Sequence, residues 1–305
     1  MGLLDEVRAN AERVATSAGY VKVRTEAIEA YAASLPLGEL ANPELDAATH
    51  YLGAPEATLA YVVTLDAINF GSGYFSKLTK RAGLSGYFTV AASLKDVYEA
   101  DGPLSAKQLQ VLSASECAWI FGQADNADPA VAELMGLFSQ ALQDLGNCVA
   151  DRFGGSFRAL VDDARGSAER LVSVLNEMPF YQDVGFYKRA QLTASDLAVA
   201  KVAQFGDLDR LTIFADNLVP HVLRLDGVLE YETDLLARIN REELIPAGSA
   251  EEWEIRGCAL HAVELITAAL HHNVTSMQLD YLLWNRGQLP VYKAQPRHRT
   301  RTVFY

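Results

Sequence analysis

The chain has 305 residues and half of them are hydrophobic, so it can bury a substantial core and is not a disordered protein. It carries 39 acidic residues against 26 basic ones, a net charge of −13, which argues against a protein that grips the phosphate backbone of DNA or RNA. Its best apolar run, residues 59 to 70, contains Asp66 and is too short to span a membrane, and its charged N-terminus lacks the apolar core of a signal peptide.

These properties favour a soluble, cytoplasmic protein that acts on a small molecule, without a membrane or a polymeric nucleic acid as partner. They do not indicate an oligomeric state. The three cysteines, Cys117, Cys148 and Cys258, are odd in number, far apart and set among apolar residues. This pattern is typical of reduced core thiols and does not indicate disulfides or a metal site.

Helical periodicity dominates the chain, because apolar residues recur every three to four positions. Near Gly19 and Pro36 the first two helical segments end, as helix termination signals predict. The predicted helical segments are 3–18, 20–34, 103–121, 129–150, 156–177, 186–204, 220–239 and 250–272.

Strand signals are few. Residues 61–65 and 87–91 are short, ambiguous strand candidates, and the alternation of strands and helices that a parallel sheet needs is absent. The breaks at 82–87, 122–129 and 151–157 have the composition of short loops, and no linker or repeat divides the chain. We therefore predict an all-α fold with at most a few short strands, in one compact domain over residues 1–305.

Two neighbouring segments place charges in apolar surroundings. Residues 186–197 read FYKRAQLTASDL and residues 207–220 read DLDRLTIFADNLVP. Charged groups are costly to bury unless they are paired or used in function. The five ionisable residues concerned are Lys188, Arg189, Asp196, Asp209 and Asp216. This stretch is therefore the first candidate for chemistry.

Helix geometry gives these charges two interpretations. Arg189 and Asp196 fall along one stripe of a helix, which predicts an internal ion pair or, equally, a ligand site.

Asp216 is expected to close a short helix just before the next one begins. At the negative end of the helix dipole it would resist ionisation unless a cation or a developing positive charge faced it. A glycosidic bond that breaks through an oxocarbenium-like state supplies such a charge, whereas the simpler alternative is a solvated loop aspartate.

Two further features have structural and functional alternatives. The segment 257–272 is apolar nearly all round, which predicts a central buried helix with His261 and Glu264 as interior residues hydrogen-bonded in the core or part of a site. A basic cluster near the C-terminus can bind a single phosphate or form a solvated tail; it comprises Lys293, Arg297, His298, Arg299 and Arg301.

An ordered series of motifs covers nearly the whole chain. The first are THYLG and YVVTLDAINFGSGYF within 49–75, SGYFTVAASL at 85–94 and MPFYQDVGFYKRAQLTASDL at 178–197. The others are DRLTIFADNLVPHVLRLDGVLEY at 209–231, EEWEIRGCALHAVELI at 251–266 and LDYLLWNRG at 279–287. In content and order these motifs resemble the queuosine salvage protein family, the queuosine 5′-phosphate N-glycosylases.

The resemblance implies an all-helical fold reminiscent of helical DNA glycosylases, with no metal and no organic cofactor. It implies hydrolysis of queuosine 5′-phosphate to ribose 5-phosphate and queuine, a 7-deazaguanine base that is reused in transfer RNA modification. The aspartate of the FAD triplet, Asp216, is then the catalytic residue. It can act as a nucleophile on the anomeric carbon, or as a base and electrostatic partner for water, and the sequence leaves this choice open.

The substrate then suggests roles for other residues. A carboxylate suits the N–H groups of a deazaguanine edge, and Asp280 and Asp209 are the candidates. Lys188 and Arg189 are the expected phosphate ligands, and His50 is expected near the cyclopentenediol arm or the sugar. For stacking on the base the candidates are Phe75, Phe214 and Tyr281, which ordinary core packing would explain equally well.

Two positions depart from the pattern of the family that the chain resembles. Residues 71–73 read Gly-Ser-Gly where bulkier residues are common, which is expected to widen a loop near the base, and Asn217 stands where tyrosine is frequent. The strictness for the phosphate and for queuine is therefore left open. The competing hypotheses are a noncatalytic binder of queuine or its nucleotide, and a hydrolase of another purine or deazapurine nucleotide.

Overall fold

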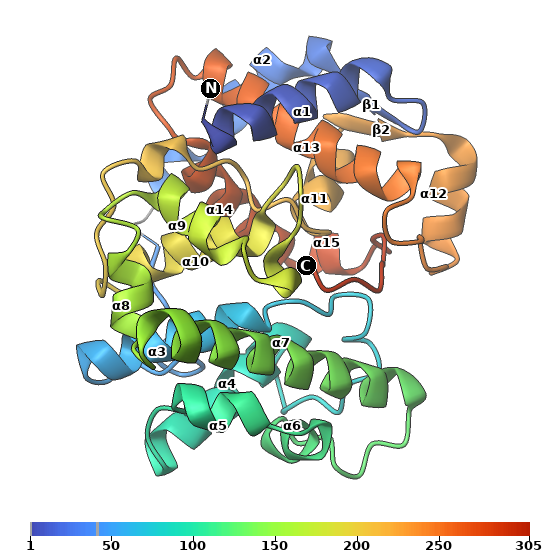
Figure 1. Ribbon diagram of the computed structural model, residues 1–305. Coiled ribbons are helices and arrows are strands. Elements are labelled where there is room, and N and C mark those ends of the chain that lie inside the picture. Colours follow the sequence, from blue (N-terminus) through green and yellow to red (C-terminus); the bar gives the residue numbers. More distant parts are fainter. Residues whose placement is uncertain (1, 41–42) are drawn as a thin grey trace.

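The computed structural model describes residues 2–40 and 43–305. The chain is mostly helical, and the described residues contain a single sheet of two short strands (Figure 1). The predicted all-α class is confirmed. No helix in these ranges is both long enough and apolar enough to cross a membrane. The single-domain assignment and the likeness to helical DNA glycosylases stay predictions.

The helices are α1 Leu3–Ser17, α2 Ile28–Ser34, α3 Pro55–Ala67, α4 Gly86–Ala100, α5 Ala106–Val111, α6 Ala114–Ile120, α7 Pro129–Phe153, α8 Phe157–Asp162, α9 Ala168–Leu175, α10 Lys188–Val199, α11 Val219–Leu225, α12 Thr233–Asn240, α13 Ala250–Ala269, α14 Ser276–Gly287 and α15 Pro290–Lys293. Four 3₁₀ turns are η1 Thr25–Ala27, η2 Leu37–Glu39, η3 Pro179–Tyr181 and η4 Leu208–Arg210. Strands β1 Val21–Val23 and β2 Leu229–Tyr231 pair antiparallel, with Val21 opposite Tyr231.

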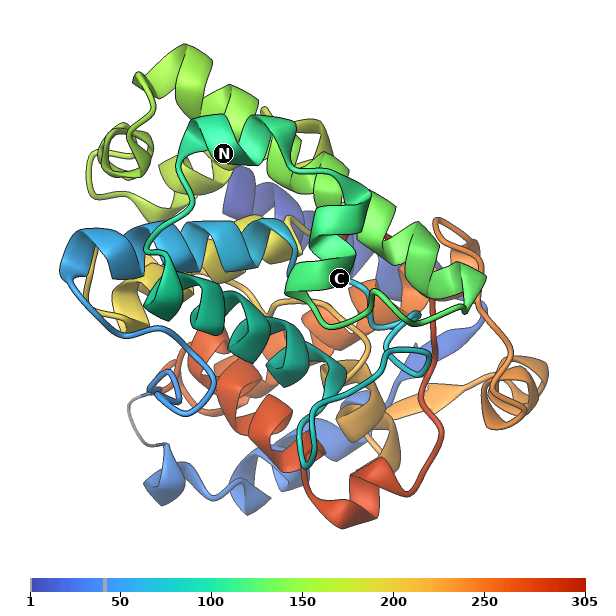
Figure 2. The ribbon, with the colours of Figure 1, turned by 90° about the horizontal axis from the view of Figure 1, so that it is seen from below.

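The helices form two groups that meet at α10. In the lower group α3, α5, α6 and α8 pack on the long helix α7, and Figure 2, seen from below, brings this group to the front. In the upper group α1, α2, α14 and the sheet pack on α13. Helix α10 contacts α3 of the lower group and packs on α9, which in turn contacts α1 of the upper group. The residues from 188 to 199 therefore lie where the two groups come together.

Local sequence signals explain where the main helices begin and end. Helix α7 starts at Pro129 behind the cap Asp128, whose carboxylate accepts the Ala130 N–H at 2.9 Å, and it stops at Gly154, which adopts a left-handed conformation. Helix α14 starts with a capping box of Thr275 and Gln278. These signals fix the direction in which α14 enters the upper group.

Several predicted helices prove to be two or three elements. The segment 20–34 begins with strand β1 before α2, and 220–239 contains α11, strand β2 and α12. Segments 103–121 and 156–177 each break into two helices, α5 with α6 and α8 with α9. Capping serines within these segments, Ser113 and Ser167, start the second helix in both cases.

The two strand candidates were wrong. Residues 61–65 lie inside α3 and residues 87–91 lie inside α4. Every residue of α3 from Thr58 to Ala67 is buried, so no polar face marks its helical period. A buried helix segment and a buried strand then have the same hydrophobic pattern.

The central helix prediction is confirmed by α13, most of whose residues are buried. Its Glu264 is partly exposed and forms an ion pair with Arg8 at 2.8 Å, besides a hydrogen bond from Ser276. His261 is partly buried on the same helix. Neither residue lines the pocket described next. A structural role for Glu264 and His261 is therefore favoured over a role in the site.

Candidate active site

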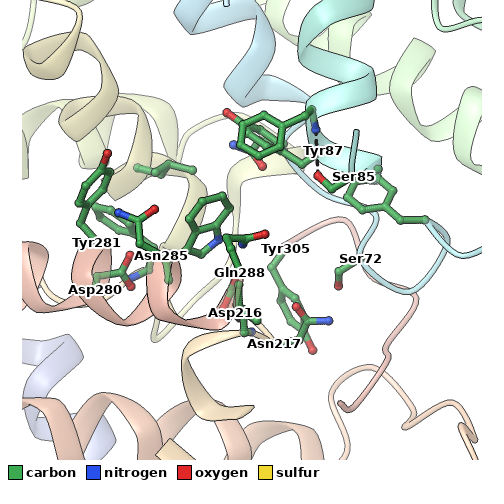
Figure 3. A pocket seen from close by; sticks show the side chains of 18 of the residues that line it. Ser72, Ser85, Tyr87, Asp216, Asn217, Asp280, Tyr281, Asn285, Gln288 and Tyr305 are labelled. Atoms are coloured by element: carbon green, nitrogen blue, oxygen red, sulfur yellow. Dashed lines mark hydrogen bonds between the residues drawn. The ribbon is translucent and has the colours of Figure 1, made fainter. Parts of the chain in front are cut away.

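A pocket of about 780 Å³ opens where α10, α14 and the C-terminal segment approach one another (Figure 3). Its walls come from the loop 43–50, the segment 69–88, one face of α10, the loop 214–218, α14 and residues 293–305. Figure 3 shows Asp280, Tyr281 and Asn285 of α14, and Gln288 directly after this helix, in the same pocket as Asp216. Aromatic and carboxyl side chains thus share one concave site, as small-molecule pockets commonly do.

Asp216 lies in this pocket, in a loop that leads into α11. Its Oδ1 accepts hydrogen bonds from the backbone N–H groups of Leu218 (2.7 Å) and Val219 (3.3 Å). The predicted helix before Asp216 is wrong, because residues 211–215 have no regular secondary structure. The carboxylate therefore supplies a hydrogen-bond acceptor to the backbone next to the start of α11.

Lys188, the first residue of α10, also lines the pocket and is only 6% exposed. Its Nζ donates to the carbonyl of Asn69 at 3.4 Å. Burial lowers the pKa of this ammonium, and the charges of Asp216 and Asp66 act in the opposite direction. The charge of Asp216 therefore favours the cationic form of Lys188, whereas burial makes this charge costly.

Asp280 of α14 is buried and anchors the same loop from the other side. Its Oδ1 accepts the backbone N–H of Phe214 at 2.9 Å. Burial, reinforced by the charge of Asp216, raises the pKa of Asp280 well above its ordinary value. A neutral carboxyl group can both donate and accept hydrogen bonds, which suits recognition of a base edge.

Asp196 also lines the pocket, and the predicted ion pair with Arg189 is wrong. No hydrogen bond or ion pair holds its carboxyl group to another part of the chain that the structure describes. Burial and the neighbouring carboxylate of Asp66 raise its pKa well above the ordinary value. Asp196 is thus a second carboxyl group of the pocket wall whose surroundings favour the protonated form.

Arg189 points away from the pocket into the core. Its guanidinium donates to the carbonyls of Asp66, Ala67 and Phe180 and is 2% exposed. The first two carbonyls belong to the last turn of α3, where a helix favours a cation. A bound phosphate has no access to this group, so the position does not support the phosphate role predicted for Arg189.

Asp209 is exposed on η4 and does not line the pocket. Its position does not support the predicted contact with a base edge. Asp209 lies within the 3₁₀ turn η4, seven positions before Asp216, which lies in the loop that leads into α11. Closeness to Asp216 in the sequence therefore does not bring Asp209 into the pocket.

The other predicted residues lie in the pocket wall: His50, Phe75, Phe214 and Tyr281. The imidazole of His50 contacts the Tyr87 hydroxyl through Nε2 at 2.9 Å and Thr49 through Nδ1 at 3.1 Å. Burial lowers the pKa of His50, which favours the neutral ring. His50 is therefore a polar, uncharged part of the wall.

Sequence reasoning missed several lining residues, including Tyr87, Trp284, Asn285, Gln288 and Tyr305. Tyr87 lay in a segment taken for a strand candidate, and the α14 residues fall within the LDYLLWNRG motif. In the C-terminal basic cluster, Lys293, Arg297 and Arg299 line the pocket. Arg299 pairs with Glu242 at 3.2 Å, whereas Arg297 has no ion-pair partner within residues 2–40 and 43–305.

The sequence predicts that the small residues at 71–73 widen a loop near the base, and this stays a prediction; in the structure the C-terminal segment lies against Gly73. A Cβ atom on Gly73 would lie 2.3 Å from the carbonyl oxygen of Thr300. The Gly71 N–H donates to the carbonyl of Tyr305 at 3.1 Å. Asn217 donates to the carbonyl of His298 at 3.2 Å. Both departures from the family pattern thus hold the C-terminal segment against the site.

Comparison with known proteins gives one consistent result. Residues 49–305 match the family described as queuosine salvage protein. The chain is 35% identical to a queuosine 5′-phosphate N-glycosylase/hydrolase of Sphaerobacter thermophilus, over 100% of this chain and 98% of that protein. It is 31% identical to the protein of the same name from Mus musculus, with 83% of each chain covered. For the Dictyostelium discoideum protein the identity is 30%, over 82% of this chain and 79% of the relative.

Proposed function

The chain belongs to the queuosine salvage protein family, and we propose that it hydrolyses the N-glycosidic bond of queuosine 5′-phosphate. The products are queuine and ribose 5-phosphate. The observation that carries this proposal is the match to the named relatives along nearly the whole chain, combined with a pocket that holds Asp216. Fold alone would not support an activity.

Asp216 is the catalytic residue in this proposal. The bond between C1′ and the base nitrogen breaks with its electron pair leaving on the base, and positive charge develops on the ribose. The Asp216 carboxylate either bonds to C1′, with water later displacing it, or takes the proton of a water that attacks C1′. The two N–H groups that hold its Oδ1 leave Oδ2 as the oxygen available for either step.

The departing base must take up a proton. Asp280 and Asp196 are the pocket carboxyl groups whose pKa is raised well above the ordinary value, which favours their protonated, proton-donating form. We assign them to the base edge, with Asp196 in place of Asp209, because both line the pocket. Phe75, Phe214 and Tyr281 supply apolar faces for the base, and His50 supplies a polar contact to the sugar or the cyclopentenediol arm.

Binding of the phosphate group requires cationic side chains, and this acidic chain has them at few places. Lys188 remains a proposed ligand, and Arg297 replaces Arg189, because the Arg297 guanidinium lines the pocket without an ion-pair partner among the described residues. Burial lowers the pKa of Arg297, and the charge of Asp216 opposes this effect. The charge of Asp216 thus acts on both Lys188 and Arg297. This is expected if the phosphate that they bind and the carbon that reacts belong to the same ribose.

A single experiment separates this activity from its alternatives. The protein is incubated with queuosine 5′-phosphate, queuosine and guanosine monophosphate, and the free base is followed by chromatography. We expect queuine from queuosine 5′-phosphate, little from queuosine and no guanine. Release from all three at similar rates would refute the substrate assignment, and binding without release would identify a noncatalytic binder.

A further inference from the structure

Arg256, in the middle of α13, is one of the largest fully buried side chains of the protein, with 1% exposure. Its Nε donates to the carbonyl of Ala215 at 2.9 Å. Its two terminal nitrogens donate to the two carboxylate oxygens of Asp183, at 3.0 and 2.5 Å. One guanidinium therefore holds the backbone immediately before Asp216 and grips a carboxylate in a bidentate pair.

Asp183 has a second partner at the start of α10. Its Oδ2 accepts the backbone N–H of Lys188 at 3.1 Å. The residue before this helix, Tyr187, has a φ of 49° and contributes no side-chain cap. Asp183 therefore replaces the missing cap and fixes the first turn of the helix that carries Lys188.

The pair is enclosed by aromatic rings and a second acid. The Arg256 guanidinium lies 4.1 Å from the ring centre of Phe186 and 4.7 Å from that of Tyr305. Glu252 lies 3.4 Å from the same guanidinium. Burial acts to lower the pKa of Arg256, but the charge and hydrogen bonds of Asp183 outweigh burial and raise it. The Arg256 guanidinium therefore stays charged and has little freedom to rotate.

Stability alone does not explain such a pair. A buried ion pair recovers its desolvation cost only with good geometry, and packed hydrophobic side chains often stabilise a fold as well. Hydrophobic side chains would leave the Ala215 carbonyl and the Lys188 N–H without their present partners. The directional bonds from Ala215 through Arg256 and Asp183 to Lys188 are what the pair adds.

We propose that Asp183 and Arg256 are positioning residues that set the Asp216 carboxylate relative to the Lys188 ammonium through the backbone of Ala215 and Lys188. This inference rests on the proposed function, because it assigns the two positioned groups to the reaction on queuosine 5′-phosphate. Neither positioning residue lines the pocket, so neither touches the substrate. Their effect is on the geometry of the step and not on ligand contacts.

The test uses Arg256→Lys, which keeps the charge but loses the planar fork and the Nε donor. Asp183→Asn, which keeps the shape and one acceptor, is the second variant if the first does not fold. The control is Arg158→Lys, because Arg158 of α8 also joins a carboxylate, Glu56, to a backbone carbonyl, that of Val202, but away from the pocket. Hydrolysis of queuosine 5′-phosphate, thermal unfolding and amide hydrogen exchange are measured for each.

For Arg256→Lys we expect kcat to fall about 100-fold, the loss associated with a misplacement of about 1 Å, while KM changes by less than about threefold. Amide exchange should rise together in residues 186–190 and 214–219. In the control, both kcat and exchange in these segments should match the wild type. A folded Arg256→Lys or Asp183→Asn protein with wild-type kcat would overturn the proposal, as would a rise in exchange in only one of the two segments. If the wild type does not hydrolyse the substrate, the proposed function fails, and exchange alone decides whether the two segments are coupled.

Discussion

Replacing Asp216 by asparagine removes the reactive charge and preserves the local structure. An asparagine oxygen can still accept the N–H groups of Leu218 and Val219, which Oδ1 of Asp216 accepts at 2.7 and 3.3 Å. Asparagine and aspartate are about equally good at such helix starts. The change therefore separates the chemistry of Asp216 from its role as a cap.

The structure gives a magnitude for each role. Loss of the carboxylate as nucleophile or base should lower kcat by about 10²- to 10⁴-fold. Asp216→Asn should alter the free energy of unfolding by only a few tenths of a kcal/mol, whereas Asp216→Ala should cost about 1 kcal/mol because both N–H groups lose their acceptor. Both variants should be inactive, and only the alanine variant should be measurably less stable.

The assay combines three measurements on both variants. Release of queuine from queuosine 5′-phosphate gives kcat, calorimetric titration with queuine gives affinity, and urea unfolding gives stability. Binding of queuine by Asp216→Asn should persist, because Asp280 and Asp196 remain in place. An Asp216→Asn variant with wild-type turnover would refute the catalytic assignment. Equal stability of Asp216→Ala and the wild type would show that the carboxylate does not cap α11.

Three further predictions concern the phosphate, pH and the C-terminal segment. Arg297→Met should raise KM for queuosine 5′-phosphate by about 10- to 100-fold, the loss expected for a charged hydrogen bond of about 1.5–3 kcal/mol, without weakening binding of queuine. Arg189→Met should instead destabilise the fold by about 1–3 kcal/mol, because buried carbonyl groups lose their hydrogen-bond donor. Equal effects of Arg297→Met and Arg189→Met on KM would contradict the assignment of Arg297 to phosphate binding and of Arg189 to stability. Burial raises the pKa of Asp66 from 3.8 to about 7, so its stabilising contribution is complete below about pH 4 and is lost as the pH rises through about 7. Asp66→Asn should therefore increase stability relative to the wild type more at pH 8 than at pH 5 in urea unfolding, and the opposite order would exclude a raised pKa. Gly73→Ala should lower both stability and turnover, because its Cβ would collide with Thr300, whereas Gly136→Ala in α7 meets no atom within 4 Å and should stabilise the helix by about 0.5–1 kcal/mol. Thermal unfolding of the two glycine variants checks this prediction. Equal shifts in their unfolding temperatures would mean that the C-terminal segment moves to make room for the added methyl group.

The fold class and much of the pocket could be predicted from the sequence. Helical periodicity and the order of motifs can be recognised without knowing how the side chains pack. The direction of single side chains could not. Lys188 and Arg189 are neighbours, and a helix turns by 100° between them, so one faces the pocket and the other the end of α3. A sequence shows that they differ in direction but not which of them meets solvent.

The same limit applies to Asp196 and Arg189. They share a helical stripe, but the long arginine side chain reaches the carbonyls of another helix instead of the nearby carboxyl group. The Asp183–Arg256 pair joins residues 73 positions apart, and neither residue had a local signal. Contacts that close such long loops depend on the whole packing arrangement, which periodicity does not describe.

The C-terminal segment forms part of a pocket that also uses residues 43–50. Folding must therefore join regions of very different sequence position before the pocket exists, and such non-local contacts form slowly. Ligand affinity is then a property of the global native state. A ligand that binds this pocket should raise the unfolding free energy of both helix groups together, in proportion to the logarithm of its concentration.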